Sequence, residues 1–361
     1  MPPKTAQEIA KSIPPLPAAI SKLQESPRLE VSEAVKIVSC DPALAARVLK
    51  LSNSTFYGRR GRVQSLNDAV VTLGVHTVRS LALGLAVAQM RQKVPLVPGL
   101  ASLQLRFWRN SVATSVAASS IAKRLRLSCR DEAFTGGLVG RVGQLGMMRA
   151  YGAGYATFLA PAVVQGDDLA PREEVAFGLS HLEVGHAMCQ AWNLPERLTA
   201  LVGGTLASEE ELGSAIRLAR GLAEACGFGG LGSDVLDLSE LELILRAKPP
   251  ALLEVVGELS AAVSEAAETL ELPAVGEPSL SGASVQIEIA DPIAAQTVEL
   301  IVRGLGCEVV PGAAVVLADS GRAVHGERLV FDVTQHGLQD QRLSVSRFRR
   351  ALISFLAGVP S

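Results

Sequence analysis

The stretch FWRNSVATSVAASSIAKRL, residues 107–125, restricts the fold of this chain more than any other feature. It contains no glycine or proline, and its alanines and serines recur along one helical face. Small side chains on such a face let a neighbouring helix approach closely. Only 4% of the residues are aromatic, whereas Ala, Leu and Val are abundant, which suits closely packed helices. The sequence therefore predicts a mainly α-helical protein.

The pattern changes near the C-terminus. A chain of 361 residues predicts about two domains, and LPAVGEPSLSGA interrupts the helical patterns with Pro, Gly and Ser. Beyond it, SVQIEIAD alternates like a half-buried strand, PIAAQTVELIVRGLG has helical spacing, and AAVVLAD and RLVFDV are short β-rich runs before a last helix. We predict an all-α domain over residues 1–272, a linker over 273–283 and a small α/β domain over 284–361.

Several helix boundaries are marked by capping residues. Asp41 stands as an N-cap before Pro42, where proline is well tolerated at the first helical position. Ser65 is placed to accept a hydrogen bond from the amide near Asp68. Gly74 predicts the end of that helix, and another helix follows at once.

Charge and cysteine usage exclude some classes of protein. The formal net charge is −2, so no global positive field draws the chain to nucleic acid or an anionic membrane. The five cysteines never form a CxxC pair, and we expect small buried residues, not a zinc ribbon or a disulfide framework. We find no signal-peptide pattern and no apolar run of about 18 residues, and predict a cytoplasmic protein without membrane contact.

The first domain carries a family resemblance. The run IPPLP, then DPALAARVLKLSNSTFYG and SLNDAVVTLGVHTVRSLALGLAVA, resembles the HDOD domain, a non-catalytic offshoot of the HD metal-dependent phosphohydrolases. The resemblance continues through DEAFTGGLVGRVGQLG and HLEVGHAMCQAWNLPERL and covers roughly residues 8–270. It implies an all-α fold and a role in bacterial signal transduction.

The same resemblance locates the metal ligands that an HD hydrolase would need. The first histidine would fall at Asn110, and the paired histidine and aspartate would fall at Gly140 and Arg141. Gly140 offers no side chain, and Arg141 places a permanent positive charge where a cation would sit. His181 and His186, five apart, would point about 140° apart on a helix. We therefore predict no catalytic residue, no metal site and no cofactor.

The stretch FTGGLVGRVGQLG, residues 134–146, is then expected to be a helix kept for packing, whose glycines let backbones approach each other. We expect Arg141 to fill the emptied cleft and to pair with an acidic residue, because an unpaired buried guanidinium is costly. The candidates for this partner are Glu173, Glu174 and Glu183.

The C-terminal domain resembles a response-regulator receiver domain in its strand and helix order. By this resemblance Asp319 falls at the phospho-acceptor position. The acidic pair that would bind magnesium is reduced to Asp291, and no lysine occurs after Lys248. Phosphoryl transfer needs both the metal and the lysine to stabilise charge. We therefore expect a degenerate receiver that small phosphodonors do not phosphorylate at Asp319.

Together these features favour a non-catalytic bacterial signal-transduction scaffold or adaptor that binds other signalling proteins. Two alternatives remain. The loop with Arg59, Arg60 and Arg62 could serve a nucleotide or nucleic-acid sensor, although a short cluster on a chain of net charge −2 argues against one. A residual HD-type phosphodiesterase is opposed by Gly140 and Arg141. The sequence does not define the partner, the pathway or the oligomeric state.

Overall fold

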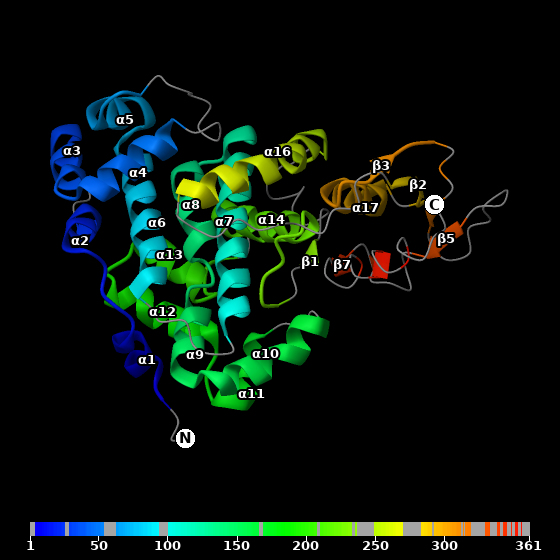
Figure 1. Ribbon diagram of the computed structural model, residues 1–361, viewed down its shortest axis with the longest axis horizontal. Helices are drawn as coiled ribbons and strands as arrows, with labels where there is room; N and C mark the ends of the chain where they lie inside the picture. Colours follow the sequence, from blue (N-terminus) through cyan, green and yellow to red (C-terminus); the bar gives the residue numbers. More distant parts are fainter. Residues whose placement is uncertain are drawn as a thin grey trace.

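The computed structural model has a helical part and a smaller α/β part (Figure 1). The structure describes residues 4–25, 29–53, 63–93, 100–165, 169–207, 210–232, 235–236, 249–269, 283–290, 292–311, 313, 315–318, 329–332, 338–339, 342–344, 348, 351–352 and 355. The fold is mainly helical, which confirms the predicted class.

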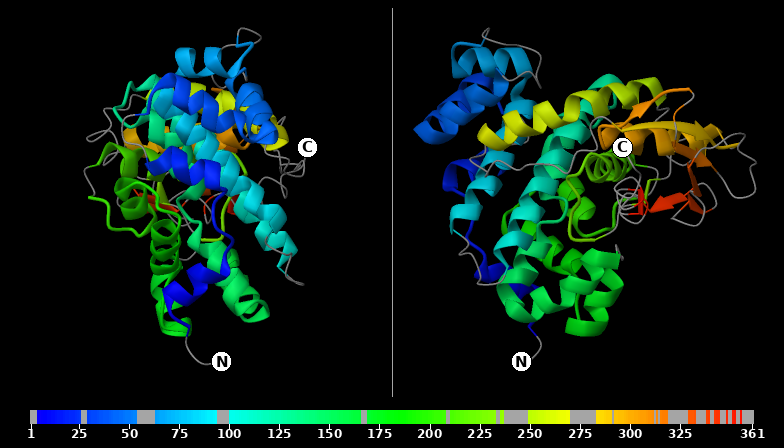
Figure 2. Two further views of the ribbon diagram at one scale, coloured as in Figure 1. Left: turned by 90° about the vertical axis from the view of Figure 1, so that its left-hand side faces the viewer. Right: turned by 45° about the vertical axis from the view of Figure 1, so that its right-hand side comes forward.

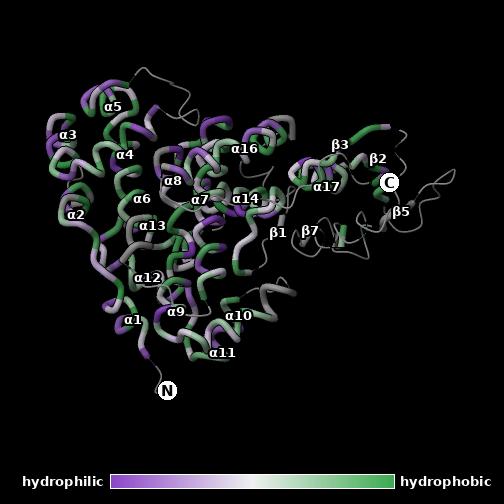
Figure 3. The backbone as a smooth tube through the Cα atoms, viewed as in Figure 1, coloured by the Kyte–Doolittle hydropathy of each residue, from purple (hydrophilic) through white to green (hydrophobic). Residues whose placement is uncertain are grey.

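The helices of the first part follow one another along the chain. They are α1 (Ala6–Ser12), α2 (Ala18–Glu25), α3 (Val31–Ser39), α4 (Pro42–Ser52), α5 (Leu66–Leu73), α6 (Val75–Lys93), α7 (Ala101–Arg124), α8 (Arg130–Val139), α9 (Gly143–Tyr151), α10 (Ala153–Gln165), α11 (Ala170–Phe177), α12 (His181–Ala191), α13 (Glu196–Val202), α14 (Glu211–Ala225) and α16 (Pro249–Thr269). Outer helices such as α3 and α5 carry both hydrophobic and hydrophilic residues, as expected where one face meets the core (Figure 3).

The capping predictions are confirmed. Oδ1 of Asp41 accepts hydrogen bonds from the amides of Ala43 and Leu44, at 3.0 and 3.1 Å, at the start of α4. The hydroxyl of Ser65 accepts from the amide of Asp68 at 3.0 Å, at the start of α5. That helix ends at Gly74, whose φ of 88° favours glycine.

Helix α7 forms the centre of the helical part. It is buried along most of its length and packs against α8, α14 and α16, and the right-hand view of Figure 2 shows it running through the helical body. The contact with α8 is close enough that a Cβ atom on Gly137 would lie 2.5 Å from Cα of Ser115. The small-residue face predicted from the sequence therefore lies at the close contact with α8.

The stretch at residues 134–146 does not form the single helix that we expected. Helix α8 ends at Val139, and α9 begins at Gly143. Between them lies a turn in which the amide of Val142 donates to the carbonyl of Val139 at 2.8 Å. A Cβ atom on Gly143 would collide with the carbonyl oxygen of His181, so α9 meets α12 backbone to backbone. The expected role of the glycines in close packing is confirmed.

The α/β part contains the strands and the helix that the sequence predicts. Its elements are β2 (Ser284–Glu288), α17 (Pro292–Gly304), β3 (Glu308–Val309), β4 (Val315–Ala318) and β5 (Leu329–Asp332). The four strands form a parallel sheet in the order β3-β2-β4-β5, with Val285 opposite Val309 on one side and Val315 on the other. The described residues of the predicted last helix, Phe348, Ala351, Leu352 and Phe355, are helical.

A second, antiparallel sheet joins the two parts and was not predicted. It consists of β1 (Val235–Leu236), β6 (Leu338–Gln339) and β7 (Arg342–Ser344), in the order β1-β7-β6. Helix α17 also packs against α14 and α16, as the right-hand view of Figure 2 shows. A Cβ atom on Gly304 would lie 3.1 Å from the backbone of Ala225. One cluster of buried apolar residues runs through both parts.

Some predictions concern residues outside the described part of the chain. They are Arg59, Arg60, Arg62, Asp319 and most of the 273–283 linker. The domain boundaries therefore stay a prediction. Among the described helices, no single one has the length and apolar character to cross a membrane, although α5 and Val75–Ala88 of α6, bent by 118°, pass that test as a pair.

The cysteine prediction is wrong for one residue. Cys40 is exposed, because it follows α3 on the surface, while Cys129, Cys189, Cys226 and Cys307 are buried. All five thiols are free. Burial raises the pKa of Cys189 to about 12.

The close contact between α7 and α8 predicts a cost for any side chain at Gly137. We expect Gly137→Ala to lower the free energy of unfolding by about 1–3 kcal/mol, because the new methyl group meets backbone atoms of Ser115. The matched control is Gly257→Ala in α16, where a Cβ atom meets nothing within 4 Å. There alanine should stabilise by up to ~1 kcal/mol. Equal denaturation midpoints for the two variants would contradict the packing argument.

Candidate functional site

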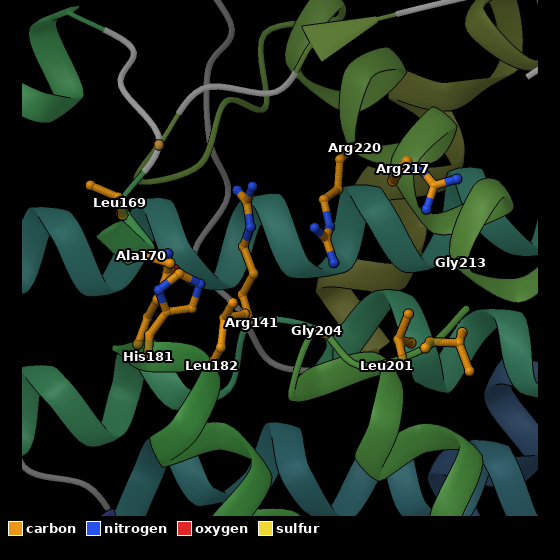
Figure 4. Close-up of a pocket in the computed structure, with 14 residues that line it drawn as sticks. Arg141, Leu169, Ala170, His181, Leu182, Leu201, Gly204, Gly213, Arg217 and Arg220 are labelled. Carbon is orange, nitrogen blue, oxygen red and sulfur yellow. The ribbon is translucent and has the colours of Figure 1, made fainter. Parts of the chain in front are cut away.

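A cavity of about 270 Å³ lies beside the α8–α9 turn (Figure 4). Its walls also include the starts of α11 and α12, the end of α13 and one face of α14. The residues that line it are Gly140, Arg141, Gln144, Leu169, Ala170, His181, Leu182, Leu201, Gly204, Leu206, Gly213, Arg217, Arg220 and Gly232.

The turn between α8 and α9 brings Arg141 to this cavity. Arg141 is half-buried and follows Gly140, at which a Cβ atom would lie 2.7 Å from the carbonyl oxygen of Gly136 and 3.2 Å from Nη2 of Arg220. Glycine at this position therefore lets the chain turn and lets the guanidinium of Arg220 approach the turn.

Helix α14 supplies two further arginines. Arg217 and Arg220 are three residues apart, so they share one face of the helix. Nη2 of Arg217 donates to the hydroxyl of Ser214 at 3.0 Å. In Figure 4, Arg141 extends from the turn and Arg220 extends from α14 into the same space, with Arg217 beside them. Three permanently charged guanidinium groups thus line one cavity.

Asn110 lies next to this site and holds the loop after α14. Its Nδ2 atom donates to the carbonyl of Phe228 at 2.7 Å, and the side chain is buried. Nη2 of Arg106 donates to the carbonyl of Gly230, also at 2.7 Å. A Cβ atom on Gly230 would lie 2.9 Å from Oδ1 of Asn110 and 3.1 Å from Nη1 of Arg141. Asn110 therefore has a structural role at the position where the HDOD resemblance predicts the first ligand.

A buried carboxylate stands behind His181. Glu173 is fully buried and accepts hydrogen bonds from the hydroxyl of Tyr155 and from the backbone amide of His181, the latter at 2.7 Å. Its Oε2 atom also lies 2.6 Å from Nδ1 of His181. Burial raises the pKa of Tyr155 well above its usual 10, and the nearby Glu173 adds to the shift, so the phenol stays protonated as a donor.

Gln144 carries an unusual donor. Its side chain is 1% exposed and lines the cavity, and its Nε2 atom has no hydrogen-bond partner among the residues that the structure describes. Buried polar groups are nearly always hydrogen-bonded, because an unsatisfied donor loses its bond to water without compensation. This amide therefore calls for a partner inside the cavity.

The structure brings together the three positions that the HDOD resemblance singles out. Gly140 and Arg141 form the turn, and Asn110 meets Arg141 at Gly230. Arg141 does not fill the cleft, however, because the cavity remains beside it. The expectation that its side chain closes the cleft was therefore wrong.

The three acidic candidates and the histidines have different surroundings. Glu173 accepts hydrogen bonds from Tyr155 and His181, and Glu183 accepts one from the amide of Ser180 at 2.8 Å. Glu174 is exposed. The pairing of Arg141 with an acidic residue stays a prediction. His186 lies against Gly203 and does not line the cavity. In the described residues, no group of three or more His, Cys, Asp and Glu side chains is placed to hold a metal ion.

Sequence reasoning missed Arg217, Arg220 and Gln144. A signal for the arginines is present, because ELGSAIRLARGLAEA is otherwise rich in small and apolar residues and places both on one face. Nothing local marks Gln144, whose importance arises only where α9 meets α12.

Comparisons with known proteins concern mainly the helical part. Residues 11–204 match the HDOD domain. An uncharacterized protein of Treponema pallidum (strain Nichols) is 25% identical over 191 residues, which make up 51% of this chain and 36% of that protein. The chain thus spans little more than a third of the length of this relative.

Solved structures share the fold. A protein of Shewanella amazonensis SB2B described as a "Putative phosphohydrolase" has a TM-score of 0.57 and 23% identity, over 74% of this chain and 99% of that one. An HDOD domain protein of unknown function from Geobacter sulfurreducens has a TM-score of 0.57 and 19% identity, over 73% and 98%. A "Putative signal transduction protein" of Marinobacter aquaeolei VT8 has a TM-score of 0.55 and 21% identity, over 74% and 61%.

Because its carboxylate is buried, a conservative substitution of Glu173 should lower the stability of the fold. Glu173→Gln should lower the free energy of unfolding by about 1.5–3 kcal/mol, because the amide removes one acceptor and turns a donor toward Tyr155 or His181. Glu174→Gln, one residue away and exposed, should change it by less than ~0.5 kcal/mol. Urea denaturation of both variants measures the difference. A near-neutral Glu173 variant would show that these hydrogen bonds contribute little.

Proposed function

We propose, from the premise that this chain belongs to the HDOD family, that it is a non-catalytic signal-transduction scaffold that binds other signalling proteins. The proposal rests on the chemistry of the three former ligand positions. A metal-dependent hydrolase uses neutral imidazoles and ionised carboxylates to hold the ion that activates water. Here the positions hold an amide, no side chain and a cation.

The geometry around these positions favours a structural use. The amide of Asn110 donates to the carbonyl of Phe228, and both Oδ1 of Asn110 and Nη1 of Arg141 approach Gly230. A divalent cation at these positions would face the permanent charge of Arg141. At one of the three positions the side chain thus holds the loop after α14 against α7.

The C-terminal part supports a signalling role. We propose that it is a degenerate receiver-like domain, because the parallel order β3-β2-β4-β5 corresponds to the first four strands of the doubly wound order 2-1-3-4-5. One protein of the same fold is described as a "Putative signal transduction protein". The pairing of β1 with β7 joins this domain to the helical part, and such a joined pair of domains suits an adaptor that presents a composite surface.

The absence of ligand chemistry at Gly140 and Arg141 leads to a metal prediction. We expect purified protein to contain far less than one Mn, Fe or Zn per chain and to leave bis(p-nitrophenyl) phosphate intact when Mn²⁺ is added. Elemental analysis and absorbance at the wavelength of nitrophenolate measure the two quantities. One tightly held metal per chain, together with metal-dependent hydrolysis, would contradict the non-catalytic proposal.

The scaffold role leads to a second prediction, on partners. The full-length chain, used as bait in a lysate of its host, should retain a specific signalling protein such as a kinase, cyclase or regulator in near-stoichiometric amounts. The control is the same chain carrying Gly137→Ala and Gly143→Val, which should disturb the helical packing without changing the charge. Recovery of the same proteins with both baits, or of none, would count against a scaffold.

A further inference from the structure

We propose that the cavity lined by Arg141, Arg217 and Arg220 binds a small organic phosphate without a metal ion. The inference goes beyond the scaffold role, and it stands whether or not the chain binds other proteins. It is also distinct from the Arg59, Arg60 and Arg62 loop, which lies outside the described residues.

The wall of the cavity is positively charged. Arg141 comes from the α8–α9 turn, and Arg217 and Arg220 come from α14, so two separate elements converge on one space. Guanidinium groups bind phosphate oxygens through paired, charge-assisted hydrogen bonds. None of the described residues that line the cavity is acidic. Glu173 and Glu224 are buried in α11 and α14, but neither belongs to the lining.

The side-chain amide of Gln144 also indicates a ligand, for a reason that does not depend on charge. Its Nε2 donor is buried, lines the cavity and has no hydrogen-bond partner in the described part of the chain. A ligand that brings an acceptor oxygen next to Arg141, three residues earlier in the chain, would satisfy this donor. An oxyanion would accept a hydrogen bond from this donor and would also bind the arginines of the wall.

The apolar part of the lining limits the ligand further. Four leucines also line the cavity, and they are Leu169, Leu182, Leu201 and Leu206. Ligand sites typically combine such apolar walls with a few placed polar groups. A volume of about 270 Å³ admits a compact molecule with an anionic end and an organic body. A nucleic-acid strand or a folded domain does not fit in it.

Phosphate is favoured over carboxylate because of charge. A single carboxylate group carries one negative charge on two oxygens, whereas a terminal phosphate group carries up to two on three oxygens, which matches three guanidinium groups better. Citrate spreads its charge over three separate carboxylates. Phosphate binding to HD hydrolases depends on the bound metal. Here Arg141 stands at a former ligand position, so the same cleft would hold the anion through the protein's own cations.

The test is calorimetric titration of the full-length chain with pyrophosphate, AMP and citrate, in buffer that contains EDTA. We expect both phosphates to bind more tightly than citrate. Arg217→Ala and Arg220→Ala should each weaken phosphate binding by about 10-fold or more, the loss typical of a charge-assisted hydrogen bond. Arg130→Ala removes the same charge from an exposed residue at the other end of α8 and should leave the affinity unchanged.

Gln144→Leu separates a ligand-binding role from a structural one. It removes an unpartnered buried donor, so the unliganded protein should melt at the same or a higher temperature, while affinity for the phosphates falls. If this variant melts lower and binds as the wild type does, the amide is structural and the inference fails. Arg217→Lys, which keeps the charge, should retain part of the affinity and guards against misfolding of the alanine variants.

Three other outcomes would overturn the proposal. They are absence of phosphate binding to the wild type, citrate binding as tight as pyrophosphate, and equal affinity of Arg217→Ala and the wild type. Phosphorus NMR of the ligands after titration shows whether they remain intact. Intact, bound phosphate supports the inference even if the scaffold role fails, and hydrolysis only in metal-loaded samples would instead count against the non-catalytic proposal.

Discussion

Backbone contact between helices is the constraint on which the site depends. At Gly137 helix α8 touches the backbone of α7, and at Gly143 helix α9 touches the backbone of α12. No side chain separates either pair, so neither contact adjusts without moving a whole helix. The turn that carries Arg141 lies between these two fixed points. The position of the Arg141 backbone therefore follows from the glycines on either side of it.

The fold was largely predictable because its signals are local. Asp41, Ser65 and Gly74 mark helix ends through bonds to residues within a few positions, and these bonds are present. The strands of the parallel sheet also follow from their alternation and apolar runs. The pairing of β1 with β7 could not be foreseen, since it joins two- and three-residue strands that are about a hundred positions apart and carry little pattern of their own.

The site was predictable only in part. The HDOD resemblance places Asn110, Gly140 and Arg141 together, and the structure does the same. The break after Val139 was missed because no proline marks it and because five glycines in the stretch allow either a helix or a turn. Arg217, Arg220 and Gln144 join the site only through packing between distant helices. Such convergence has no signature along the chain.

Helix α14 connects the cavity to the α/β part. Its middle carries Arg217 and Arg220 at the cavity, while its last turn, at Ala225 and Cys226, lies against Gly304 of α17. Its 15 residues form a rod roughly 22 Å long. A tilt of about 5° about the position of Arg217 would displace the last turn, about 12 Å away, by roughly 1 Å. The helix thus has the geometry of a lever arm, with the cationic wall near its fulcrum and the α/β part at its tip.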